Sequence, residues 1–195
     1  TRRSTSRTSP SSRRPGYADR RLGLEEFESS VTQPEPEFDP APVLIRFADA
    51  GADFVVIGGV AGGVHGSAYP TYDVDLAYSR ALDNLELVAA TLQELRATLR
   101  GAPPDLPFIL DAKSLAEGGN FTFDTTLGKI DILAYPSGSP AYETLRADAS
   151  EITVEGRVVR VASLDHLIAM KEAAGRTKDK LMASELRVIS DLLRA

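Results

Sequence analysis

Residues 57–76, IGGVAGGVHGSAYPTYDVDL, carry the two features from which the fold of this chain is inferred. Gly58 and Gly59 end a short apolar run, and after thirteen further residues Asp73 and Asp75 alternate with apolar residues. Successive side chains of a strand point to opposite faces, so the two carboxylates project together, roughly 6 to 7 Å apart. Carboxylates this close repel each other unless a cation lies between them, which indicates a divalent metal site. An edge strand with a solvated acidic face is the alternative.

Composition narrows the choice of metal. The 195-residue chain has no cysteine, which excludes disulfides, thiolate nucleophiles and cysteine-ligated zinc. His65 and His166 are the only histidines, so a zinc site would need a ligand set rich in carboxylates. Mg²⁺ or Mn²⁺ held by oxygen ligands is therefore favoured.

Charge is distributed unevenly along the chain. Residues 1–21 hold seven arginines and one aspartate, which leaves fifteen basic and twenty-seven acidic residues, a net charge of −12, for the rest. Nucleic-acid-binding domains are usually basic, so any RNA contact has to come from a local basic patch or from the tail. Residues 54–72 lack charged side chains, but five glycines and a proline argue against a membrane helix. We expect a protein without a membrane segment, located in the cytoplasm.

Two regions of different composition are expected. Residues 1–39 are predicted to be a flexible, basic tail rich in serine and proline, with at most a short helix at 22–31. A plain tail, an arm that contacts nucleic acid and a targeting segment are all compatible with that composition. Residues 40–195 are predicted to form a single domain, with a sheet and its helices in 40–162 and C-terminal helices in 163–195.

The pattern in residues 40–195 predicts a mixed α/β (α+β) fold, a small mixed sheet flanked by helices. A helix at 43–50 precedes a strand at 53–57, a glycine turn that enters a short helix ended by Pro70, and a strand at 71–78. The clearest helix is 81–100, with an apolar stripe and a capping box of Asp83 and Glu86. The other expected elements are a strand at 108–110, hairpins across 125–128 and 155–156, a helical turn at 142–147, and helices capped by Ser163 and Thr177.

Three further polar residues stand out by their position. Asp131 lies between Ile130 and Ile132, so its side chain projects away from the face that those residues bury; it is either a third site carboxylate or a solvated residue. Lys171 falls on the apolar stripe of its helix, where it either covers the core with its stem or reaches into a cleft that receives an anion. Asp179 lies in the first turn of the last helix, where a carboxylate also favours the helix dipole.

The glycine-rich stretch matches neither the Rossmann fingerprint nor the P-loop. It resembles the nucleotidyltransferase superfamily typified by DNA polymerase beta, in which a strand ending in Gly-Gly or Gly-Ser is followed by Asp-x-Asp and by a third acid on a later strand. Four segments also resemble the minimal nucleotidyltransferases of bacterial toxin–antitoxin systems, the AbiEii and MenT toxins: GGVAGGVHG, PTYDVDL, NFTFDTTLGKIDIL and VASLDHLIAMKEAAGRTKDK. The resemblance covers residues 43–193. Many relatives have an arginine before Thr-x-Asp-x-Asp, where this chain has Tyr69 and Pro70.

The resemblance implies a nucleotidyltransferase fold and an enzyme of the EC 2.7.7 type. It assigns two Mg²⁺ or Mn²⁺ ions to Asp73, Asp75 and Asp131, and Asp131 would also accept the proton of the attacking hydroxyl. The implied nucleotide-binding residues are Gly58, Gly59, Ser67 and Lys171. Lys171 would neutralise phosphate charge, and Asp179 would orient that lysine or line the nucleotide pocket, which completes a catalytic set of Asp73, Asp75, Asp131, Lys171 and Asp179.

The toxin resemblance further implies transfer of pyrimidine nucleotides from CTP or UTP to the 3′ end of tRNA, which blocks aminoacylation and translation. The implied partners are tRNA and a cognate antitoxin protein. A basic run could contact tRNA phosphates or be a solvated helix face: Arg176, Lys178, Lys180 and Arg187. Thr71 is a candidate for regulatory phosphorylation or an ordinary strand threonine. An antitoxin-like enzyme that AMPylates a partner protein, a small-molecule nucleotidyltransferase and a binding module without catalysis are the alternatives.

Overall fold

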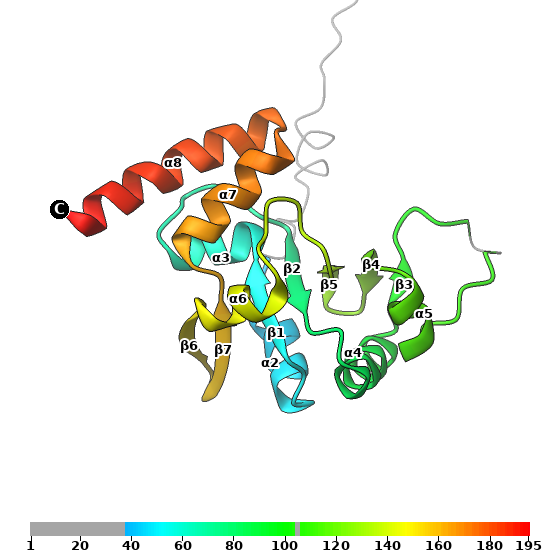
Figure 1. Cartoon of the computed structure of the whole chain (residues 1–195). Coiled ribbons are helices and arrows are strands. Elements are labelled where there is room, and N and C mark those ends of the chain that lie inside the picture. Colours follow the sequence, from blue (N-terminus) through cyan, green and yellow to red (C-terminus); the bar gives the residue numbers. More distant parts are fainter. Residues whose placement is uncertain (1–37, 104–105) are drawn as a thin grey trace, which may run out of the picture. The chain divides into compact units, whose positions relative to one another are not determined.

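The structure, a computed structural model, describes residues 38–103 and 106–195 (Figure 1). The predicted tail and its helix at 22–31 lie outside these residues, except for residues 38 and 39. In chain order the elements are α2 (Ala41–Asp49), β1 (Phe54–Ile57), α3 (Gly58–Val64), β2 (Asp73–Tyr78), α4 (Leu82–Glu94), β3 (Thr98–Leu99), α5 (Ala112–Glu117), β4 (Asn120–Thr125), β5 (Gly128–Leu133), α6 (Tyr142–Ala147), β6 (Ser150–Val154), β7 (Arg157–Val161), α7 (Leu164–Ala174) and α8 (Thr177–Arg194).

All seven described strands belong to one sheet, in the order β3-β4-β5-β2-β1-β7-β6. The β2–β5 and β1–β7 pairs are parallel, and the other neighbours are antiparallel. The predicted mixed sheet with flanking helices is therefore confirmed. β1 is buried along its whole length, as expected for a strand at the centre of a covered sheet. No helix in the described ranges is long and apolar enough to cross a membrane.

One face of the sheet is apolar and forms the core. Its buried side chains come from β2, β4 and β5 and share one cluster with α2 and α4: Val74, Leu76, Phe123, Ile130 and Ile132 from the strands, and Phe47, Leu85, Val88 and Leu92 from the helices. Each such side chain contributes about 1.5 to 3 kcal/mol by leaving water. Because strand side chains alternate, the acids between these apolar residues are directed to the opposite face.

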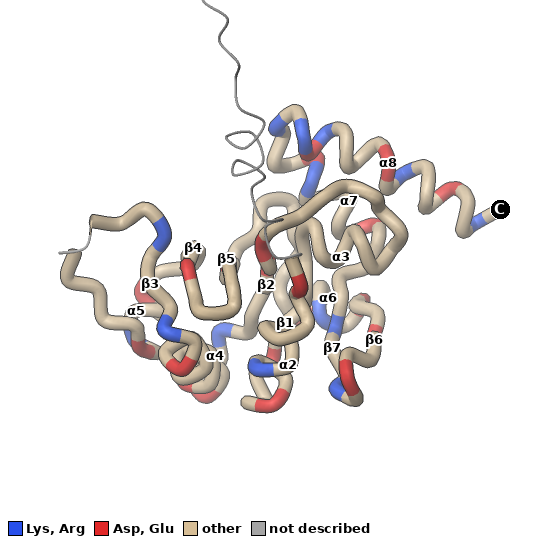
Figure 2. The backbone as a smooth tube through the Cα atoms, turned by 180° about the vertical axis from the view of Figure 1, so that it is seen from behind, with Lys and Arg blue, Asp and Glu red and all other residues tan. Residues whose placement is uncertain are grey.

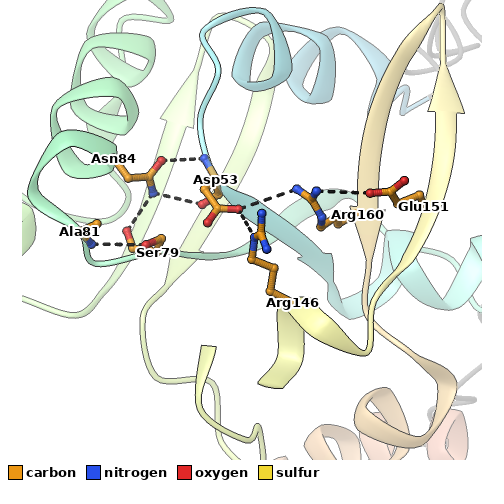
Figure 3. Close-up of polar contacts among 7 residues, drawn as sticks. All are labelled: Asp53, Ser79, Ala81, Asn84, Arg146, Glu151 and Arg160. Carbon is orange, nitrogen blue, oxygen red and sulfur yellow. Dashed lines mark hydrogen bonds and ion pairs between the residues drawn. The ribbon is translucent and has the colours of Figure 1, made fainter. Parts of the chain in front are cut away.

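A buried asparagine fixes the register between β1 and β2 (Figure 3). The Asn84 amide donates to the backbone carbonyls of Asp53 (3.0 Å) and Ser79 (2.8 Å), and its Oδ1 accepts from the Asp53 amide at 2.6 Å. The Asp53 carboxylate in turn pairs with Arg146 at 2.8 Å and Arg160 at 3.9 Å. This network ties the residue before β1 and the first turn of α4 to the residue after β2, and so holds the strand that carries the acids in place.

Several local predictions are confirmed. Gly51, directly after α2, has φ +74°, and Gly175 ends α7 with φ +69°, as a helix-terminating glycine should. The Ser163 hydroxyl accepts from the His166 amide at the start of α7. Glu155 and Gly156 both have positive φ in the β6–β7 hairpin, the backbone that a two-residue hairpin turn requires.

The segment before the acids differs from the prediction. α3 begins at Gly58 itself and ends at Val64, well before Pro70, because Gly66 adopts φ +98° and turns the chain. β2 begins at Asp73, so Thr71 lies in the preceding loop and not in the strand. An irregular loop of residues 66–72 therefore leads into the first acid.

The helix predicted for residues 81–100 is also shorter. α4 ends at Glu94, Arg96 has φ +53°, and residues 98–99 form β3 on the edge of β4. Hydrogen bonding to a neighbouring strand replaces the last helical turn. This outcome depends on tertiary strand pairing and not on local helix propensity. The predicted capping box is absent as well, since the N-cap is Ala81 and the Asp83 carboxylate accepts from the adjacent Asn84 amide.

Three further differences are local. Residues 108–110 form no strand, and the unpredicted helix α5 follows them, capped by Asp111, whose carboxylate accepts from the Ser114 amide at 2.7 Å. Thr177 was predicted to cap α8 but is its first residue, and Arg176 occupies the cap position without a side-chain bond to the helix backbone. The sheet and its acid-bearing strands are unaffected.

Candidate active site

The parallel pairing of β2 with β5 brings the three predicted acids onto one face of the sheet. Asp75 is the Cα partner of Asp131, and Asp73 is the partner of Lys129. Directly opposed residues of neighbouring strands project to the same side. All three acids line one cleft of about 440 Å³.

Most of the other predicted site residues line the same cleft. They are Gly58, Gly59, Thr71, Lys171 and Asp179. Ser67 is not among its lining residues: its hydroxyl donates to Glu185 of α8, whose carboxylate also accepts from the Ala68 amide. The side chain predicted to bind nucleotide is therefore directed toward α8 in this structure.

The glycine pair allows α3 to start directly against the acids. Gly58 has φ +65°, and a Cβ at this position would overlap the carboxylate of Asp75. A Cβ at Gly59 would overlap the side chain of Thr71. Glycine is thus required for a close approach between the end of β1 and the acid-bearing segment.

Thr71 lies beside the first acid although it precedes the strand. Its hydroxyl donates to the Asp73 carboxylate at 3.1 Å and is 3.3 Å from the Asp73 carbonyl. The side chain is partly buried under Gly59. Thr71 was predicted to be a strand residue; it lies outside β2, and its side chain still contacts the first acid.

The electrostatics of the acids favour a bound cation. Burial raises the pKa of Asp75 to about 7, and the charges of Asp73 and Asp131 contribute to that rise, while Lys171 and the Gly59 amide oppose it. The pKa of Asp131 is also raised, by burial first and by Asp73, against the effect of Arg100. A shift of this kind, from burial and like charges in a cleft, is typical of functional sites.

The donor set suits Mg²⁺ or Mn²⁺, since it consists of three carboxylates on one sheet face. Oδ1 of Asp131 is buried, and the close contact that it makes among the described residues is with the Arg100 guanidinium. Within the described ranges, however, no three His, Cys, Asp or Glu side chains lie close enough together to hold a metal ion without rearrangement. Asp131 is instead directed toward Arg100, whose Nη2 lies 3.0 Å from Oδ1.

Cationic side chains from the junction of α7 and α8 line the same cleft as the acids. Asp179, 1% exposed, lies 3.4 Å from the Lys171 ammonium and 2.5 Å from Nε of Arg176. Burial acts to raise the pKa of Asp179, but the Arg176 hydrogen bond and the charge of Lys171 hold it below its ordinary value. Asp179 therefore stays ionised and holds both cations at the cleft. Figure 2 shows the gathering of basic residues at this junction.

No protein-family model matches the sequence, and no curated protein does. Among solved structures, the fold is similar to that of the lincosamide antibiotic adenylyltransferase LnuA with bound lincomycin, with a TM-score of 0.52 and 14% identity over 76% of this chain and 94% of that one. The chain has the nucleotidyltransferase fold. Weaker similarity extends to a Thermotoga maritima protein assigned as a nucleotidyltransferase, with a TM-score of 0.48 and 13% identity over 74% of this chain and 89% of that one.

Three residues that line the cleft were not predicted from the sequence to be parts of the site. Arg176 was predicted only as part of a basic run, although its place directly after Gly175 and three residues before Asp179 was a usable signal. Tyr72 is 70% exposed next to Asp73, and no periodicity marks it. Arg100 was assigned to the end of a helix, so its approach to Asp131 was not predicted.

Proposed function

We propose that this protein is a metal-dependent nucleotidyltransferase that transfers a nucleotide from a nucleoside triphosphate to an acceptor hydroxyl. The observation that carries the proposal is the placement of Asp73, Asp75 and Asp131 on one sheet face, in one cleft with Lys171 and Arg176. Carboxylates and cationic side chains in one cleft suit a triphosphate substrate, because some of its oxygens can coordinate metal ions held by the carboxylates while others pair with the cations.

The reaction forms a bond between the acceptor oxygen and the α-phosphorus, and breaks the bond from that phosphorus to the bridging oxygen of the leaving pyrophosphate. Divalent ions held by the three carboxylates would polarise the phosphate and stabilise the leaving group. Asp131 would accept the proton of the acceptor hydroxyl. Lys171 and Arg176, held by Asp179, would neutralise charge on the departing phosphates.

For the acceptor we propose the 3′ end of tRNA, with CTP or UTP as donor. Arg176 and Lys178 line the cleft, and the exposed rings of Tyr69 and Tyr72 line it as well. Basic side chains together with exposed aromatic rings suit an unpaired strand, whose bases stack while its phosphates pair with cations. A toxin activity restrained by a cognate antitoxin is supported by the motif resemblance.

A small-molecule acceptor is the second candidate. It is supported by the similarity to LnuA, an adenylyltransferase of a lincosamide antibiotic. The partly open cleft of about 440 Å³ is large enough for such a molecule.

A labelling experiment tests these proposals. The full chain is incubated with Mg²⁺ and each of the four radiolabelled triphosphates, in separate reactions with total tRNA, with a lincosamide and with no added acceptor. Asp73→Asn serves as the inactive control. Label on tRNA supports the first proposal, and label on the antibiotic supports the second. Label on protein alone would favour the antitoxin-like activity, and no label on any acceptor would overturn nucleotide transfer.

A further inference from the structure

Arg100 is held on the acid-bearing face of the sheet. It follows β3 directly, and its backbone amide donates to the Thr122 carbonyl at 2.9 Å, which continues the pairing with β4. Its side chain is 27% exposed, and Nη2 donates to the Phe123 carbonyl at 2.8 Å. The guanidinium is therefore fixed near the strands by a backbone carbonyl, independently of any carboxylate.

Two carboxylates compete for this guanidinium. Nη2 lies 3.0 Å from Oδ1 of Asp131, and Nε lies 3.4 Å from Oδ1 of Asp124. Asp124 is the Cα partner of Lys129 across β4 and β5, so it projects to the same face as Asp131. Asp131 is 18% exposed and lines the cleft, whereas Asp124 is 52% exposed beside it.

The contact with Asp131 is an ion pair without hydrogen-bond geometry. Oδ1 of Asp131 and Nε of Arg100 are both buried, and neither has a hydrogen-bond partner among the described residues. An ion pair without that directional bond retains its Coulomb attraction but lacks the additional stability of a charge-assisted hydrogen bond. A competing cation therefore has mainly the Coulomb attraction of this ion pair to overcome at Oδ1 of Asp131.

We infer that Arg100 is an internal counter-ion. Its guanidinium pairs with Asp131 in the metal-free protein and is displaced from this carboxylate when a divalent cation binds. The inference rests on the proposed function, because it concerns the metal ions of that same site. Arg100 is a positioning residue: it holds Asp131 in place on a face that already carries Asp73 and Asp75. When a cation takes Asp131, the guanidinium keeps the Phe123 carbonyl and pairs with Asp124.

This exchange predicts opposite effects on metal binding for the loss of Arg100 and the loss of Asp124. Removing the arginine frees Asp131 for the metal, so a divalent cation should bind more tightly. Removing Asp124 leaves Arg100 with Asp131 as its one carboxylate partner in the described part of the chain, so the cation should bind more weakly.

Direct titration with Mn²⁺, without nucleotide, tests the inference by the electron paramagnetic resonance signal of the free ion. We expect Arg100→Gln to bind Mn²⁺ about tenfold more tightly than the unaltered chain, and Asp124→Asn to bind it about threefold more weakly. Arg46→Gln is the charge-matched control, because Arg46 is exposed on α2 and does not line the cleft. Its effect should stay within about twofold.

The outcomes separate this inference from the proposed function. Mn²⁺ binding that is equal in all four proteins, or that weakens in Arg100→Gln while the variant stays folded, overturns the counter-ion role and leaves the metal site intact. Failure of every protein to bind Mn²⁺ overturns both. If Arg100→Gln does not fold, weaker binding by Asp124→Asn still supports the inference, and unchanged or tighter binding by that variant overturns it.

Discussion

Asp75 lies directly opposite Asp131 in the parallel pair of β2 and β5, and the two carboxylates share one cleft. Like charges at this position destabilise each other, and burial adds to the cost. The fold accepts this because the opposite face of both strands is fully apolar and buried. A site that is unfavourable without a cation is thus built on two strands whose opposite face is buried in the core.

Asp131→Asn should abolish most nucleotide transfer without unfolding the protein. Loss of a general base costs about 10²- to 10⁴-fold in rate, and loss of a metal ligand adds to this. The fold should remain because the side chain is directed into the cleft and not into the core. Steady-state rates with labelled triphosphate, beside a circular dichroism spectrum, check the prediction; activity within about threefold of the original would contradict it.

Asp75→Asn should stabilise the metal-free protein at high pH. The pKa of Asp75 is about 7 in the folded state against an ordinary value of 3.8. Below pH 3.8 both states are protonated and the carboxyl has no effect; between 3.8 and 7 the unfolded state loses its proton first, so folding is progressively disfavoured as pH rises. The full cost, up to about 4 kcal/mol, applies above pH 7.

Thermal unfolding in a chelator, at one pH near the ordinary pKa of an aspartate and at one above the raised pKa of Asp75, measures this difference. The melting temperature of Asp75→Asn should exceed that of the unaltered chain most at the higher pH and by little at the lower. A difference in melting temperature between the two proteins that does not change with pH would show that burial of the charged carboxylate does not cause the stabilisation.

Gly58→Ala should impair both stability and activity. The position has φ +65°, and the new Cβ would overlap the Asp75 carboxylate. A residue with a Cβ in this conformation costs about 1 to 3 kcal/mol. Gly63→Ala in the same helix is the matched control, because its Cβ would meet no atom within 4 Å and its φ is not positive. Chemical denaturation compares the two; equal stabilities would refute the predicted overlap.

Tyr72→Ala should weaken binding of the acceptor and spare the nucleotide, if the acceptor is an unpaired RNA end. Stacking of one base on an aromatic side chain contributes about 1 to 3 kcal/mol, so KM for tRNA should rise roughly 5- to 100-fold. Tyr72 is 70% exposed, so the fold should not change. Tyr72→Trp should retain affinity. Equal KM values for tRNA in the alanine and tryptophan variants would exclude a stacking role.

Local patterns predicted several features of the residues around the cleft. The alternation of Asp73 and Asp75 predicted that they project together, and the alternation around Asp131 predicted that it faces away from Ile130 and Ile132, because the strand period depends only on backbone geometry. The Ser163 cap and the Gly175 terminus of α7 were likewise predicted, since both reflect bonds within a few residues. Lys171 and Asp179 were predicted as a pair from the motif resemblance, and the structure places their charged atoms 3.4 Å apart.

Contacts between distant segments could not be predicted in this way. Residues near the end of the helix predicted at 81–100 form β3, because they pair with β4 at the edge of the sheet. This pairing places Arg100 beside Asp131. The Ser67 hydroxyl bonds to Glu185 of α8, far along the chain, and so lies away from the cleft. Such choices depend on the free energy of the whole sheet and its helices, which no short stretch of sequence determines.

The alternating acids of residues 57–76 were therefore sufficient to predict that Asp73 and Asp75 project together, because strand alternation is a property of the local backbone. The strand register that sets Asp75 against Asp131, and the arginine that neutralises Asp131, exist only in the folded chain. Both arise from strand pairing between segments that are remote in sequence, and pairing of that kind is specified by the assembled core.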